Sequence, residues 1–248
     1  MTNSGLIASV TDSERFSNIA LDFDGFNEGN DCGNHADLQI TNKISVFCWV
    51  KGGPLINKPF LCKWEGLGKR SWYLGSGGAT SPTKGRMLLS RDGSFDPGEI
   101  KAWDTSIDVL DDEWNHFGFT FESNLANAYV NGTEDTSMDK IANDIIVSIY
   151  NTSQTVRIGE TNTAFFTGNL DHCVIFKDRL LAAEVLELYK IGRPGDLTKH
   201  SKFSDSVLWQ WMGDGDTIPN IADHSAAGNS PGLTANMTAA NREPDTAP

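Results

Sequence analysis

The chain has no cluster of basic residues. Its 20 lysine and arginine residues are outnumbered by 33 aspartate and glutamate residues, and the net charge is -13. The acidic residues are spread over the whole length, and no basic run occurs that could follow a phosphate backbone. Nucleic acid is therefore not an expected partner.

The chain also lacks a long apolar run. No segment approaches the ~20 apolar residues that a membrane helix needs, so a membrane is not an expected partner. The first residues contain no basic segment followed by an apolar stretch, which is the pattern of a secretory signal. We therefore expect synthesis in a cytoplasm without a signal peptide.

Cysteines are few, and none are closely paired. The four lie at positions 32, 48, 62 and 173. Cys48 and Cys173 fall within apolar strand patterns and are predicted to be small buried side chains. The absence of a Cys-x-x-Cys pair argues against a zinc knuckle or a redox dithiol. A disulfide between Cys32 and Cys62 is the minor alternative.

Recognisable catalytic motifs are missing as well. The chain has no Glu-x-Asp-x-x-Glu spacing on a strand, which would place two carboxyl groups across a glycosidic bond. It has no Gly-x-Ser-x-Gly nucleophile elbow and no glycine loop ending in Gly-Lys-Ser/Thr. The densest acidic run, residues 108–113, precedes a strand in what the sequence indicates is a turn. We therefore predict no catalytic residues.

What the chain does contain is a succession of short segments rich in β-branched and aromatic residues, separated by turn residues. This pattern predicts antiparallel sheets. In residues 114–121 the side chains of Phe117, Phe119 and Phe121 fall on one face of a strand, as the two-residue repeat requires. The predicted strands cover residues 19–23, 45–50, 60–64, 71–75, 86–90, 100–105, 115–121, 126–130, 155–158, 170–176 and 207–212.

Only one helix is predicted, over residues 181–191. Leu181, Val185, Leu188 and Tyr189 recur there at intervals of three to four residues. The residues that follow, Gly192 and Pro194, are typical of a helix end.

Three motifs carry a resemblance to a known family. They are FTGNLDHCVIFKDRLLAAEVLELY at residues 166–189, LDFDGFNEGND at 21–31 and YVNG at 129–132. Together they resemble the laminin-G-like module of the concanavalin A-like lectins and glucanases. This resemblance implies an all-β fold, a two-sheet antiparallel jelly-roll sandwich with one short helix on its C-terminal side. In that family a serine commonly caps the helix. Leu181 occupies the matching position here, so Asp178 is predicted to cap instead.

The resemblance also suggests how the chain is divided. We expect an N-terminal arm over residues 1–18, a jelly roll over 19–240 and a flexible tail over 241–248. Residues 207–240 resemble the opening strand and loop of such a module, here displaced to follow the helix. The favoured interpretation is that this tail completes its own sandwich. The alternative is the start of a second repeat that pairs with another subunit.

The displaced segment carries the one metal hypothesis. Residues 223–229 resemble the Asp-x-Ser-Gly-x-Gly-Asn loop that binds a structural calcium ion in several concanavalin-like modules. The resemblance implies Asp223 and Asn229 as ligands, with Asp171 as the strand aspartate, although Ala226 replaces the first loop glycine. Calcium favours such mixtures of carboxylate, amide and carbonyl oxygens. The competing interpretation, slightly favoured, is an Asx-turn loop without metal. A weaker candidate comprises Asp214 and Asp216.

Exposed aromatic side chains would carry glycan binding, because sugar rings present apolar faces. Trp64, Trp72, Tyr73 and Trp103 are the predicted contacts, with Phe95 in a neighbouring loop. Their spacing within predicted strands makes core packing the better interpretation for most of them.

The tail, Trp-x-Trp-Met-Gly-Asp-Gly-Asp, is similar to that of laminin-G-like proteins of bacteriophages. The resemblance implies a non-enzymatic virion surface protein, a capsid decoration or fibre component. We expect it to be synthesised in the host cytoplasm, to form homo-oligomers, to contact other virion proteins, and to adhere weakly to polysaccharide. Two alternatives stay open. One is a free carbohydrate-binding lectin module, and the other is a polysaccharide lyase or hydrolase with unrecognised acids.

Overall fold

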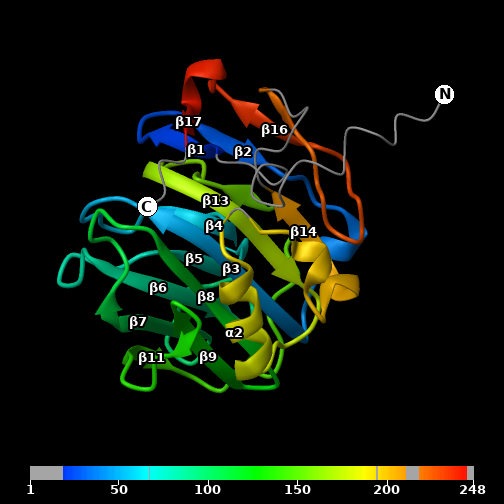
Figure 1. The fold of residues 1–248 in the computed structure, drawn as a ribbon. Coiled ribbons are helices and arrows are strands. Elements are labelled where there is room, and N and C mark those ends of the chain that lie inside the picture. Colours follow the sequence, from blue (N-terminus) through cyan, green and yellow to red (C-terminus); the bar gives the residue numbers. More distant parts are fainter. Residues whose placement is uncertain (1–18, 67, 194, 211–217, 245–248) are drawn as a thin grey trace.

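Two antiparallel β-sheets packed face to face form the body of the protein (Figure 1). The computed structural model describes residues 19–66, 68–193, 195–210 and 218–244. The chain runs repeatedly between strands of the two sheets, and the described residues include one α-helix, of ten residues, late in the sequence. The predicted all-β jelly-roll sandwich with a single short helix is confirmed for this part of the chain.

The first sheet is built around β13, whose two edges pair with different partners. One edge pairs with β3 along most of its length, whereas the other pairs with β1 near its start and with β14 near its end. In spatial order the strands are β10 (Thr133–Glu134), β9 (Leu125–Val130), β8 (Asn115–Glu122), β3 (Lys43–Lys51), β13 (Thr167–Phe176), β1 (Ile19–Asp24) and β17 (Arg242–Pro244), with β14 (Ser206–Gln210) beside β13.

The second sheet has a long central part and short strands at one end. Its centre consists of β4 to β7, which meander along the chain, each pairing with the next. In spatial order the strands are β11 (Asp139–Asn143), β7 (Ile100–Asp108), β6 (Lys84–Ser90), β5 (Arg70–Ser76), β4 (Pro59–Trp64), β12 (Arg157–Ile158), β2 (Gly29–Asp31), β16 (Gly232–Ala235) and β15 (Asn220–Ile221).

Each strand predicted from the sequence is present, and the described boundaries agree to within three residues. The end of the last predicted strand, residues 211 and 212, lies outside the described residues. The strands that the sequence did not reveal are β2, β10, β11, β15, β16 and β17, which have two to five residues each. A two-residue repeat cannot be recognised over so few positions.

The main hydrophobic core fills the space between the sheets. Phe117, Phe119 and Phe121 of β8 all point into it and are fully buried, as the alternation predicted. On the next strand, β3, Val46, Cys48 and Val50 face the same core. Core positions therefore follow the two-residue repeat of the pleated strand.

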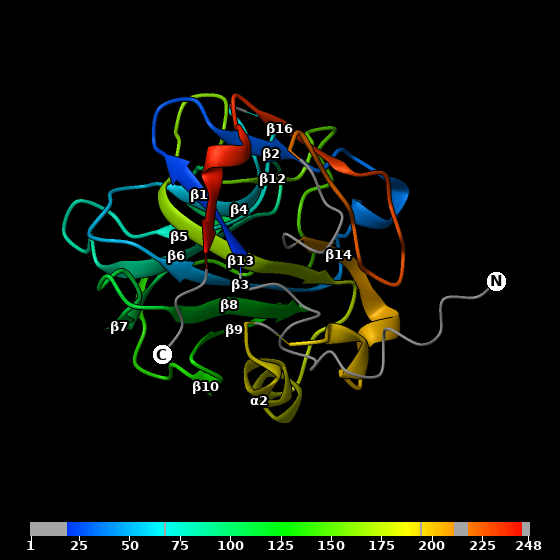
Figure 2. The same cartoon turned by 45° about the horizontal axis from the view of Figure 1, so that its top comes forward.

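The outer face of the first sheet is covered by helix α2 (Ala182–Ile191) and the short 3₁₀ segments η3 (Leu197–Lys199) and η4 (Phe203–Asp205). Figure 2 shows α2 on the side of β8 and β9 that faces away from β4 and β5. A second apolar cluster fills this layer, in which Phe47 of β3 and Trp209 of β14 pack with Val185 and Leu188 of the helix. β3 is therefore buried on both faces, by the main core on one side and by this second cluster on the other.

Leu181 is the N-cap residue of the helix, and the side chain that satisfies its N–H is not the predicted one. The Leu181 N–H donates to the Glu184 carboxylate at 2.7 Å. The Asp178 side chain instead accepts from the Arg179 N–H and from Lys202 Nζ, so the prediction of an Asp178 cap was wrong. Gly192 ends the helix at a φ of 77°, in the left-handed region that favours glycine.

The C-terminal part of the chain returns to both sheets of its own molecule. β14 pairs with β13, β16 pairs with β2, and β17 pairs with β1. Residues 242–244, assigned to a flexible tail from the sequence, therefore form a strand that follows the 3₁₀ turn η5 (Ala239–Asn241). Residues 1–18 and 245–248, the predicted arm and the end of the predicted tail, lie outside the described residues.

All four cysteines are buried and free, so the alternative Cys32–Cys62 disulfide is not formed.

Another 3₁₀ turn, η2 (Ala36–Leu38), precedes β3. Over the described ranges of the chain, none of the helices has the length and apolar character required to cross a membrane.

Candidate functional site

The outer face of the second sheet has no helix of the described residues packed on it and carries a row of outward-facing side chains. Strand register places Cys62 opposite Tyr73, Tyr73 opposite Leu88, and Leu88 opposite Ala102. These four side chains form an apolar cluster separate from the main core. Two members of the row, Tyr73 and Leu88, line a surface cleft.

The cleft has a volume of about 470 Å³, within the range of small-ligand sites. Trp64 of β4 and Phe95 of the β6–β7 loop form aromatic walls over Tyr73, and Arg70 and Arg86 add charged groups. We call this site the aromatic cleft.

Trp64, Phe95 and Arg70 contact one another at the edge of the cleft. The two rings meet edge to face with centroids 6.0 Å apart. The Arg70 guanidinium carbon lies 5.7 Å from each ring centroid. Phe95 is 44% exposed and Trp64 is half-buried, so aromatic surface remains open to a ligand. Such surface stacks on the apolar face of a planar or ring-shaped ligand.

Tyr73 places an unpaired hydroxyl at the floor of the cleft. The residue is 5% exposed, and its Oη makes no hydrogen bond with the described part of the chain. Burial raises the pKa of this phenol well above its usual range, so it stays a neutral donor and acceptor. The ring fits because the next outward position is Gly75, where a β-carbon would lie 2.5 Å from Oη. A buried hydroxyl without a partner costs about 1–3 kcal/mol, and a polar ligand would relieve that cost.

Arg86 is held rigidly at one end of the cleft. Its Nε and Nη2 donate to the two carboxylate oxygens of Asp104 at 2.6 and 2.8 Å, and Nη1 donates to Asn57 Oδ1 at 2.9 Å. Ser81 Oγ also donates to Asp104. The Asp104 side chain is 3% exposed. This network neutralises Arg86 and leaves it little freedom to reorganise around a charged ligand.

Of the four predicted glycan contacts, two line the aromatic cleft and two do not. Trp64 and Tyr73 line it. Trp72 and Trp103 face the main core and are only 1% and 4% exposed, which agrees with the core packing that the sequence favoured for most of these aromatic residues. Trp72 and Tyr73 are adjacent in β5 and must point to opposite faces, so the alternation could have excluded one of them. Arg70 and Arg86 were missed because nothing in their local sequence distinguishes them from surface residues.

The predicted calcium loop is held together by hydrogen bonds of its own. Asp223 Oδ1 accepts from the N–H groups of Trp209 and Ser225, and Oδ2 accepts from that of Asn229. The Asn229 side-chain amide donates to the Val207 carbonyl at 2.8 Å. These contacts are those of an Asx-type turn that attaches the loop to β14.

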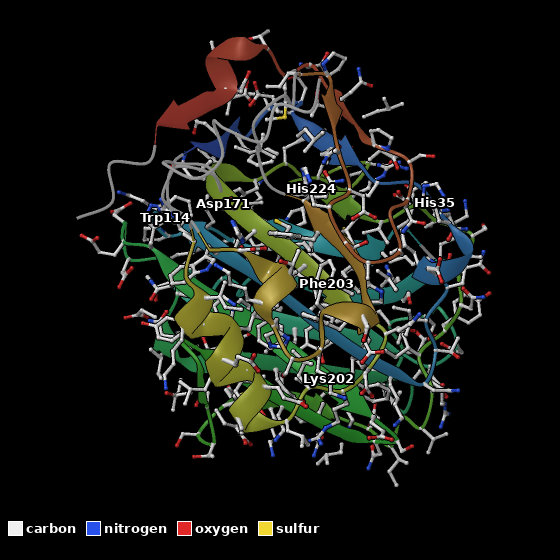
Figure 3. All side chains as sticks on the ribbon, turned by 45° about the vertical axis from the view of Figure 1, so that its right-hand side comes forward. His35, Trp114, Asp171, Lys202, Phe203 and His224 are labelled. Carbon is white, nitrogen blue, oxygen red and sulfur yellow. The ribbon has the colours of Figure 1, made fainter. Side chains whose placement is uncertain are left out.

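Asp171 lies on β13 in a different environment, near Trp114 (Figure 3). Its Oδ2 is 3.7 Å from Nε of Arg193, whose guanidinium stacks on the Trp114 ring at 3.7 Å. Burial raises the pKa of Asp171 to about 8, and its other oxygen accepts from the His172 N–H. A carboxylate that faces a guanidinium is a poor calcium ligand.

The residues present therefore do not fit a calcium shell. Within residues 19–66, 68–193, 195–210 and 218–244, no three His, Cys, Asp or Glu side chains gather in a way that could hold a metal ion. The second candidate, Asp214 and Asp216, lies outside the described residues. Calcium binding stays a prediction.

The fold agrees with a known family model. The model for laminin-G-like domains of the concanavalin A-like lectin/glucanases superfamily matches residues 25–186. A comparison with curated protein sequences finds no match.

Among solved structures, a Bacteroides ovatus protein provisionally described as carbohydrate-binding superposes with a TM-score of 0.65 at 13% identity, over 93% of this chain and 61% of that chain. The heptameric SAP-like pentraxin of Limulus polyphemus superposes with a TM-score of 0.51 at 14% identity, over 70% of this chain and 82% of that chain. At these identities the likeness is one of fold alone. The chain spans less than two thirds of the Bacteroides protein.

Proposed function

Because the chain belongs to the concanavalin A-like lectin/glucanases superfamily, we propose that it is a non-catalytic carbohydrate-binding domain whose aromatic cleft holds the sugar. The observation that carries the proposal is the buried, unpaired Tyr73 hydroxyl in a cleft whose lining also includes the half-buried Trp64 ring and the exposed Phe95 ring. The likeness of fold to a protein provisionally described as carbohydrate-binding supports the ligand class.

The chemistry of the cleft suits a sugar ring. Each sugar has an apolar C–H face that packs on an aromatic ring, and hydroxyls that need hydrogen-bond partners. The exposed ring of Phe95 and the half-buried ring of Trp64 offer the first contact. The hydroxyl of Tyr73 and the side chains of Asn57 and Thr161 at the cleft offer the second.

The carboxyl groups of the cleft favour binding over hydrolysis. Glycoside hydrolysis needs two carboxyl groups about 5 to 10 Å apart on opposite sides of the scissile bond. Glu65 is the one carboxylate that lines the cleft in the described residues. The nearest alternative, Asp104, is already paired with Arg86 and buried. We therefore propose that the sugar is held and not cleaved.

The first test is a binding measurement with two matched variants. The purified chain is applied to an array of polysaccharides and the best ligand is titrated by calorimetry. Phe95→Ala removes an exposed ring from the cleft, whereas Phe26→Ala removes an 80% exposed ring elsewhere. We expect Phe95→Ala to weaken binding by about tenfold, the scale of one stacking contact, and Phe26→Ala to leave it unchanged. Equal effects of both variants, or no bound glycan at all, would contradict the proposal.

We also propose that the domain acts on a virion surface, as a capsid decoration or fibre component. This proposal rests on the resemblance of the tail to laminin-G-like proteins of bacteriophages. A particle component should form a discrete oligomer, which light scattering on the purified chain measures. A monomer that binds glycan with high affinity would favour the free lectin module instead.

A further inference from the structure

The two arginines of the aromatic cleft differ in what satisfies their charge. Arg86 donates both arms of its guanidinium to Asp104 and a third N–H to Asn57. Arg70 makes no ion pair and no side-chain hydrogen bond with any described residue, and its contacts are the rings of Trp64 and Phe95. An unpaired arginine stands out in a chain whose net charge is -13.

We propose that the aromatic cleft selects an acidic sugar, and that Arg70 binds the carboxylate of that sugar. This inference rests on the proposed function and names the ligand class for the same site. A guanidinium presents a planar fork of N–H donors that matches a carboxylate in two parallel hydrogen bonds. The contacts with the rings of Trp64 and Phe95 are not hydrogen bonds, so the N–H donors of the guanidinium stay available.

The neighbouring rings make this arginine a better receptor than a solvent-exposed one. The triangle formed by Arg70, Trp64 and Phe95, with sides of 5.7, 5.7 and 6.0 Å, restricts the guanidinium before a ligand arrives. Less conformational entropy is then lost on binding. The same aromatic rings would pack on the sugar that carries the carboxylate. Trp64 and Phe95 would then contact the sugar ring, and Arg70 would bind its carboxylate.

One carboxylate lines the cleft and opposes an anionic ligand. Glu65 follows Trp64, which is the cross-strand partner of Arg70, and its charge contributes to raising the pKa of Glu160, after burial as the main cause. Arg70 lies against Phe95, which belongs to the β6–β7 loop. The remaining acidic surface repels an anion at long range, but salt screens this repulsion beyond about 8 Å at physiological ionic strength. Direct contact at Arg70 therefore decides the preference.

The test compares acidic polysaccharides with their own neutral forms. Pectate, alginate and hyaluronan are each offered beside the carboxyl-reduced polymer, together with neutral laminarin and xylan. We expect at least one acidic polymer to bind and its carboxyl-reduced form to bind at least about tenfold more weakly. Raising the salt concentration should weaken binding of the acidic polymer and leave binding of any neutral polymer unchanged.

Two variants with the same change of charge localise the effect. Arg70→Gln should weaken binding of the acidic polymer by at least about tenfold. Lys69→Gln, a substitution of the exposed neighbouring residue, should leave that binding unchanged. Arg70→Lys keeps the charge but loses the fork, and should give an intermediate affinity. Circular dichroism confirms that each variant is folded.

The possible failures are distinguishable. If a neutral polysaccharide binds as tightly as the acidic ones and Phe95→Ala weakens it, the proposed function stands and the preference for acidic sugars is wrong. If Arg70→Gln and Lys69→Gln have equal effects, Arg70 is not the receptor. If no polysaccharide binds, both the proposed function and this inference are overturned.

Discussion

The two sheets of the sandwich have outer faces that differ in one respect. The first sheet is covered by α2 and η3, and its outward residues Phe47, Tyr129 and Val174 are buried under them. The second sheet has a similar row of apolar residues without a covering helix in the described part of the chain, and Tyr73 and Leu88 of this row line the aromatic cleft. The same kind of strand therefore serves stability on one side and is available for recognition on the other.

The polar groups of the two outer faces also differ in their surroundings. On the covered face His116 lies between the rings of Phe47, Trp49 and Tyr189, and the helix keeps this cluster from water. On the open face the polar groups Arg70, Arg86 and Tyr73 line a space that a ligand can enter. Substitutions on the first face should mainly change the free energy of unfolding, and those on the second should mainly change the affinity for a ligand.

The largest contrast is expected between Phe47 and Phe95. Phe47→Ala removes a fully buried ring under α2 and should lower the free energy of unfolding by about 3–5 kcal/mol. Phe95→Ala removes an exposed ring and should change it by no more than about 0.5 kcal/mol. Urea denaturation measures both. Comparable losses would mean that the open face contributes to the core after all.

A smaller effect on the covered face is expected in the pH dependence of the free energy of unfolding. Burial lowers the pKa of His116 to about 3, below its unfolded value of about 6.5. The unfolded state then binds the proton more readily, so His116 contributes stability that is complete above pH 6.5 and is lost as the pH falls toward 3.

The variant His116→Phe removes this contribution. Between pH 6.5 and 5 it should gain about 1.5 kcal/mol in stability relative to the parent protein. The difference between the two proteins is the quantity to measure, because Asp171, with a pKa raised to about 8, acts in the opposite direction in both. Denaturation curves that run parallel across this range would show that His116 is not buried in the neutral form.

A smaller effect is expected when the Tyr73 hydroxyl is removed. Tyr73→Phe deletes a buried group without a partner in the described chain, so the free protein should be unchanged or up to about 1 kcal/mol more stable. Binding of the sugar should weaken about fivefold, close to 1 kcal/mol, because one hydrogen bond is lost. Calorimetry and thermal melting on the same sample separate the two. A loss of stability would mean that the hydroxyl has a structural partner.

No effect is expected from a chelator at the Asp223 loop. Its three N–H donors already satisfy the carboxylate, so calcium removal should leave the melting temperature unchanged. The check is a melting curve with and without chelator, together with metal analysis of the protein. Bound calcium and a lower melting temperature after chelation would restore the metal hypothesis.

The fold was largely predictable because strands carry their own signal. Residues 115–121 alternate between core and outward positions, and Phe117, Phe119 and Phe121 face the core as their spacing predicted. The short strands at the edge were not predictable, because two or three residues show no repeat. The helix cap was missed for a related reason: the side chain that satisfies the Leu181 N–H comes from Glu184, inside the helix.

The candidate site was predictable only in part. Aromatic residues near residues 64–103 were recognised as a group, but which of them face outward depends on the parity of each strand and on β-bulges such as the one between Lys63 and Trp64. Arg70 gave no signal, because an isolated arginine in a turn-rich segment is an ordinary surface residue.

The sequence by itself determined the fold class, the helix and most of the core, since hydrophobic periodicity is a local property that each strand expresses on its own. Only the tertiary structure decided which outer face is covered by α2 and which stays open, because this depends on where the chain leads after β13. It also decided that Tyr73, Phe95 and Arg70 meet in one cleft. Their meeting depends on strand register and loop path, which are set by contacts between residues distant along the chain.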